Sequence, residues 1–186
     1  LHTYGSLIKN IDFIDFCITS GFTYGAFFSF IALASIFMIK HLHMSLIAYG
    51  VAIALNGIVV MITSIFVPKL SEQLTHAKIG KIGLGFIMLG GFFMFIMNLS
   101  FNNTVYSFML HMLVCTVGVG FVRTAASAGA MQLVTKSIAG TAASFYNLCS
   151  FALSVIAMSL SSSVIHSIAG LGLFIAILGS LGLLLI

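Results

Sequence analysis

Apolar residues along the chain gather in six long blocks that are separated by short polar stretches. The blocks cover residues 11–39, 44–67, 79–99, 106–133, 138–159 and 168–186. A helix of about 20 apolar residues crosses a hydrocarbon core of about 30 Å, so each block can span a membrane. Barrel strands would show alternating polarity over about 10 residues, which these blocks lack. The pattern predicts an all-α integral membrane protein with six transmembrane helices.

The composition supports a membrane protein and excludes several other classes. Hydrophobic residues make up 61% of the 186 residues and charged residues 5%, whereas a soluble domain carries about a quarter charged residues. The basic residues form no basic face, so no nucleic acid is expected as a partner. The expected partner is the lipid bilayer.

Basic residues at the block ends predict the orientation. Lysines on one side of the predicted membrane are Lys9, Lys69, Lys78, Lys81 and Lys136, and Lys40 lies on the other. Because short cytoplasmic loops are enriched in lysine and arginine, the first side is predicted to be cytoplasmic. Six crossings then return the C-terminal end to the cytoplasm as well.

Arg123 is the most informative polar residue, because it lies well inside the fourth block, where a charge is costly. Its neighbours at helical spacing are Thr116, Gly120, Ser127 and Ala130, which form a small, weakly polar stripe. One interpretation is that the arginine faces a water-filled cavity. The other is that it extends to the cytoplasmic headgroups.

The fifth block carries a second polar stripe. Its members at helical intervals are Ala143, Asn147, Ser150, Ser154 and Ser161, with Tyr146 beside them. Such side chains either hydrogen bond neighbouring helices or line a solute pathway. The sequence leaves both possibilities open.

Aromatic and amide side chains in the first two blocks complete the candidate site. Tyr24 and Phe28 share a face of the first block, and Asn56 lies in the second. Aromatic residues at this spacing either pack the core or form a wall for bulky amphipathic solutes. The candidate cavity residues are therefore Tyr24, Phe28, Asn56, Arg123, Tyr146 and Asn147.

The sequence lacks the patterns that catalysis or cofactor binding requires. It contains no serine nucleophile motif, HExxH, phosphate-binding loop or pair of intramembrane aspartates, so no enzyme, catalytic residue or cofactor is expected. His41 and His43 lack a third ligand, and no metal site is predicted. Asp12 and Asp15 are expected to stabilise the start of the first helix. A transporter, a channel and a membrane scaffold remain.

Several short motifs resemble one transporter family. Residues 139–144 (AGTAAS) resemble a signature of Bcr/CflA-type drug-resistance transporters, which belong to the major facilitator superfamily. Residues 118–121 (GVGF) with 125–128 (AASA) are similar to the tenth helix of that family, and residues 54–57 (ALNG) to its eighth. Residues 25–31 (GAFFSFI) resemble its seventh helix.

The resemblance implies that the chain is the C-terminal six-helix half of a twelve-helix antiporter, built as two inverted three-helix repeats. The start at Leu1 agrees with a piece of something longer, which lacks its N-terminal half. The implied function is proton-coupled efflux of drugs or small amphipathic metabolites across the inner (cytoplasmic) membrane, with this half forming one wall of the cavity. The alternative is a membrane scaffold or a decayed fragment without activity. A channel would need a continuous polar pore face, which Gly120 and Met158 interrupt.

Overall fold

The computed structural model describes residues 2–41, 43–100 and 105–186, and every regular element in these residues is helical. The elements are α1 (His2–Lys9), α2 (Ile11–Ser35), the π-helical η1 (Ile36–His41), α3 (Leu46–Leu70), α4 (His76–Ser100), α5 (Val105–Gln132), the 3₁₀-helical η2 (Lys136–Ile138), α6 (Ala139–Val164) and α7 (Ile168–Leu185). Within these residues, six helices are long and apolar enough to cross a membrane. This confirms the predicted all-α fold with six membrane-spanning helices.

The helix starts are stabilised by short polar side chains that accept backbone hydrogen bonds. Asn10 Oδ1 accepts from Phe13 N at 3.2 Å, and Ser45 Oγ accepts from Ala48 N at the same distance. Ser167 Oγ accepts from Gly170 N at 3.0 Å. These bonds satisfy amides that the first helical turn leaves free. The cap of α2 is thus Asn10, and Asp12 follows in the first turn.

Two helices run past the boundaries that polarity predicts. The second block was expected to end at residue 67, but α3 continues through Pro68 to Leu70. Proline occupies only the last turn, where it interrupts one backbone bond. The fifth block was expected to end at residue 159, but α6 continues to Val164 because Ser162 and Ser163 donate to Ser159 O at 3.0 and 2.9 Å. Serines that satisfy their hydroxyls within the helix do not end it.

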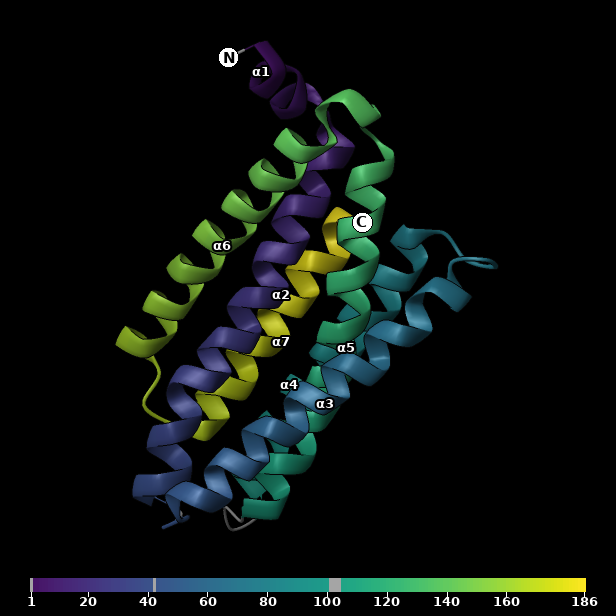
Figure 1. Cartoon of the computed structure of the whole chain (residues 1–186). Helices are drawn as coiled ribbons and strands as arrows, with labels where there is room; N and C mark the ends of the chain where they lie inside the picture. Colours follow the sequence, from purple (N-terminus) through teal and green to yellow (C-terminus); the bar gives the residue numbers. More distant parts are fainter. Residues whose placement is uncertain (1, 42, 101–104) are drawn as a thin grey trace.

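The helices are arranged around a central antiparallel pair, α2 and α5 (Figure 1). Helix α4 packs most extensively against α5 and α7, and α7 also contacts α2. Helix α6 packs along α2, and α3 packs along α5. The two flanking helices are the least covered, since 22% of the membrane window is buried in each, against 44–56% in the other four. Helices α4 and α7 therefore cover one side of the central pair, and α3 and α6 flank it.

The main helix contacts follow one pattern in both halves of the chain. Exchanging α2, α3 and α4 with α5, α6 and α7 turns the α2–α6 contact into α5–α3 and the α2–α7 contact into α5–α4. The α2–α5 and α4–α7 contacts map onto themselves. Because α2 and α5 are the first and fourth crossings, the two triplets have opposite membrane orientations. This pattern is the one expected of inverted three-helix repeats.

Glycines allow the close approach of α4 to α7. A Cβ atom on Gly91 would lie 2.6 Å from Ala176 N, and one on Gly172 would lie 2.7 Å from Gly91 O. Real Cβ atoms do not approach backbone atoms so closely. The two backbones are therefore in direct contact, as small residues allow in membrane helices.

We predict that Gly91→Ala separates α4 from α7 and lowers the free energy of unfolding by about 1–3 kcal/mol, because backbone atoms cannot move aside as a side chain can. Gly85→Ala on the same helix is the matched control, since its Cβ would meet no atom within 4 Å. The control should be neutral or stabilising by up to about 1 kcal/mol. Thermal unfolding of both variants in detergent measures this difference, and equal losses would contradict it.

Candidate functional site

A groove of about 410 Å³ lies between α2, α5 and α6. Its lining consists of Tyr24, Arg123, Thr124, Ser127, Ala128, Met131, Tyr146 and Asn147. Neither α4 nor α7 contributes a residue, so the groove lies on the side of the central pair that those helices leave uncovered. Its size falls within the range of about 300–1,000 Å³ that is usual for small-molecule sites.

The structure brings four of the six sequence candidates together in this groove: Tyr24, Arg123, Tyr146 and Asn147. They come from three helices that are distant in the sequence, so their meeting results from the tertiary fold. Phe28 lies beside the groove, because its ring stacks on Tyr24 with centroids 6.1 Å apart and an interplanar angle of 18°. Asn56 does not line the groove, because it lies between α3 and α5.

Arg123 carries the positive charge of the groove. Its side chain is exposed on the groove surface and interacts with the phenol group of Tyr24. It precedes Gln132, the last residue of α5, by nine positions, which corresponds to roughly 13 Å at 1.5 Å per residue. The backbone of Arg123 therefore lies well inside the span of α5, and Thr124 and Ser127 line the same groove.

The acidic residues of the chain lie away from Arg123. Asp12 and Asp15 line a different pocket with Leu185 of α7. Glu72, in the loop after α3, lines a third pocket with Gln132. These are the chain's three acidic residues, all of them described, and none lines the groove. The groove is consequently a positively charged site.

The residues of the polar stripe on α6 have two different roles. Tyr146 is buried, and its hydroxyl shares a hydrogen bond with Ser20 Oγ of α2. Ser150 Oγ donates to Cys17 O at 3.2 Å. Ser154 and Ser161 are also buried and donate to carbonyls of their own helix at 2.8 Å. The serines therefore join α6 to α2 or satisfy themselves, and Asn147 is the stripe member that reaches the groove.

Asn56 serves an equivalent packing role on the opposite flank. It is 1% exposed, and its Nδ2 donates to Ala52 O at 2.8 Å. Thr116 Oγ1 of α5 donates to Asn56 Oδ1 at 2.8 Å. These bonds join α3 to α5 and use the amide inside the bundle. The sequence placed Asn56 among the cavity residues because depth and polarity do not tell which side of a helix is buried.

Phe151 is a groove neighbour that the sequence analysis missed. Its ring stacks on Tyr24 with centroids 5.4 Å apart and on Phe28 at 6.4 Å. The three rings form an aromatic surface, here called the aromatic wall, beside the groove. Phe151 follows Asn147 by four positions on α6, so helical spacing from a candidate residue could have identified it.

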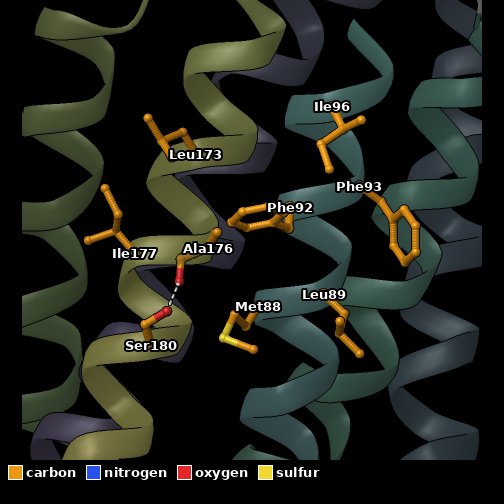
Figure 2. Close-up of a pocket in the computed structure, with 9 residues that line it drawn as sticks. All are labelled: Met88, Leu89, Phe92, Phe93, Ile96, Leu173, Ala176, Ile177 and Ser180. Atoms are coloured by element: carbon orange, nitrogen blue, oxygen red, sulfur yellow. Dashed lines mark hydrogen bonds between the residues drawn. The ribbon is translucent and has the colours of Figure 1, made fainter. Parts of the chain in front are cut away.

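A second cavity, of about 430 Å³, lies between α4 and α7 (Figure 2). Its lining is Met88, Leu89, Phe92, Phe93, Ile96, Leu173, Ala176, Ile177 and Ser180. The single hydroxyl in this set, on Ser180, donates to Ala176 O at 2.8 Å, as the dashed line in Figure 2 marks. The cavity therefore offers no free polar group to a solute. It is suited to contact with apolar chains.

Metal binding finds no support in the residues that the structure describes. No group of three or more histidine, cysteine, aspartate or glutamate side chains lies close enough together to hold an ion. Of the His41 and His43 pair, the side chain of His41 falls outside the described residues.

We predict that Asn56 and Thr116 stabilise the fold as a pair. In a double-mutant cycle of Asn56→Leu and Thr116→Val, we expect a coupling free energy of about 0.6 kcal/mol, the average for hydrogen bonds between membrane helices. Chemical unfolding of the four proteins in detergent measures this energy. Strictly additive losses would show that the two side chains act independently.

Comparison with known families adds to these observations. The family model described as Major Facilitator Superfamily matches residues 2–158, a range that contains the groove and the aromatic wall. No curated protein matches the chain. Members of this superfamily are membrane transporters. With six membrane-spanning helices and a match over most of its length, the chain belongs to the major facilitator superfamily and is a multi-pass membrane transporter protein.

Proposed function

We propose that this chain is the C-terminal six-helix half of a twelve-helix secondary transporter of the Bcr/CflA type. The transporter exports drugs or small amphipathic metabolites by alternating access, driven by an inward proton gradient. The observation that carries the proposal is the groove, in which side chains from α2, α5 and α6 converge within the membrane-spanning helices. A positive charge, an amide and aromatic rings are the groups that bind an amphipathic solute.

The arrangement of the helices supports a missing second half. The groove lies on the side that α4 and α7 leave uncovered, and α3 and α6 beside it are the least buried helices. A facing bundle of six helices would cover this side and close the groove into a central cavity. Rocking of the two halves about that cavity would expose it to each side of the membrane in turn.

The groove side chains have different roles in binding a solute. Arg123 and Asn147 supply hydrogen-bond donors, and Tyr24 supplies a phenol beside the guanidinium. The buried Tyr146 closes the wall and holds α6 to α2 through Ser20. The proton carrier belongs to the other half in this scheme, because Asp12 and Asp15 lie near the start of α2, away from the groove.

We predict that Arg123→Ala, made in the complete protein, abolishes or redirects solute efflux without preventing membrane insertion. The change removes both the charge and the planar donor group, whereas Arg123→Lys keeps the charge and should be partly active. Efflux of a dye panel from proteoliposomes with an imposed proton gradient measures the effect at equal protein content. Lys136→Ala, in the exposed first position of η2 just before α6, is the control for loss of a charge.

Two results would count against this function. Transport by the alanine variant at the parental rate and with the parental range of solutes would show that Arg123 only reaches to the headgroups. Failure of the complete protein to move any solute in the panel would favour a membrane scaffold or an inactive fragment.

We predict that both ends of the chain lie in the cytoplasm of a cell with this protein in its inner membrane. Single cysteines at Lys9, Lys78 and Lys136 should react with a permeant reagent alone, whereas a cysteine at Lys40 should also react with an impermeant one. The background first needs Cys17, Cys115 and Cys149 replaced by alanine, of which the last is only partly buried. Labelling of positions 9 and 78 from opposite sides would refute this topology.

A further inference from the structure

We propose that the groove selects aromatic organic anions, in which a carboxylate or sulfonate is attached to a flat ring system. The proposal rests on the proposed function, because it assigns a substrate class to the same groove. It is carried by two features that lie side by side: the unbalanced positive charge of Arg123 and the aromatic wall of Tyr24, Phe28 and Phe151.

The charge of Arg123 is not balanced by a carboxylate of this chain. Asp15 precedes Tyr24 by nine positions, which is two and a half turns of helix, so the two residues lie on opposite faces of α2. Asp15 faces the pocket that it shares with Leu185, away from the groove. The remaining lining groups of the groove are neutral. A guanidinium at membrane depth requires an anionic partner or water, and a solute anion provides the former.

The aromatic wall offers a flat apolar surface next to that charge. Tyr24 and Phe151 stack with an interplanar angle of 18°, and Phe151 is 47% exposed, so part of its ring is available. Tyr24 touches both features, because its ring stacks in the wall and its phenol interacts with Arg123. One molecule can therefore place an acidic group on Arg123 and a ring against the wall.

The same geometry disfavours other solutes. An organic cation would stack on the rings but would meet the positive charge of Arg123, which no carboxylate of this half offsets. A non-aromatic anion would bind the guanidinium but gain nothing from the wall. The groove thus selects for the combination of the two groups.

The test measures binding to the complete protein in nanodiscs of phosphatidylcholine. Fluorescein is an aromatic anion and ethidium an aromatic cation of comparable size, and both report binding by their fluorescence. Gluconate, an anion without a ring, is the unlabelled competitor. We expect fluorescein to bind, ethidium to bind at least about tenfold more weakly, and gluconate to compete poorly.

Variants separate the two features. Arg123→Ala should weaken fluorescein binding by about tenfold to a hundredfold, the loss typical of a charged hydrogen bond, and Arg123→Lys should recover part of it. Phe151→Ala should weaken binding by about fivefold. Phe92→Ala is the matched control, because Phe92 is 50% exposed in the α4–α7 cavity, and its replacement should leave binding unchanged.

Several outcomes would overturn the proposal. These are fluorescein binding that is unchanged in Arg123→Ala, ethidium binding as tight as that of fluorescein, and equal losses in Phe151→Ala and Phe92→Ala.

Displacement of fluorescein by phosphatidylglycerol in the nanodisc would identify a lipid headgroup as the anion that occupies Arg123. Efflux of ethidium that does not depend on Arg123 would overturn the anion selectivity and leave the transporter function standing. Absence of all transport, with fluorescein binding intact, would overturn the transporter function and leave the anion selectivity of the groove standing.

Discussion

The constraint on which this structure depends is that a polar group inside a bilayer must find its partner within the protein. Buried hydroxyls of α6 meet it by donating to carbonyls of α6 or α2, and the amide of Asn56 meets it between α3 and α5. These bonds turn polar residues into contacts between helices. The buried hydroxyls of Thr19 and Ser29 have no hydrogen-bond partner. Arg123 interacts with the phenol of Tyr24, but no carboxylate of the chain lies in its groove to balance its charge.

Close helix packing determines where the groove with Arg123 lies. Glycines bring α4 against α7 so tightly that backbone atoms touch, and the resulting layer covers one side of α2 and α5. The other side is left between the flanking helices α3 and α6. A groove forms there because α6 packs along α2 while α5 presents the small residues Thr124, Ser127 and Ala128. Small side chains that could have packed another helix instead leave space beside Arg123.

The two flanking helices α3 and α6 form similar hydrogen bonds to the central pair but present different surfaces. Asn56 and Thr116 join α3 to α5, as Tyr146 and Ser20 join α6 to α2. On the α6 flank, the neighbouring residues Asn147 and Phe151 reach the groove and the aromatic wall. A single repeat architecture therefore yields a polar and aromatic surface on one flank, next to the one arginine of the groove.

The sequence by itself determined the class of the protein and the number of its membrane-spanning helices, because the length and hydropathy of each block are local properties that decide whether it can cross a bilayer. It also identified Tyr24, Arg123, Tyr146 and Asn147, which the groove brings together. Only the tertiary structure decided that Asn56 bonds Thr116 within the bundle, that Ser150 of α6 donates to α2, and that Phe151 completes the aromatic wall. In a helix that is apolar on every side, hydrophobicity does not distinguish the face that meets lipid from the face that meets protein, so the orientation of each side chain follows from which helices pack together.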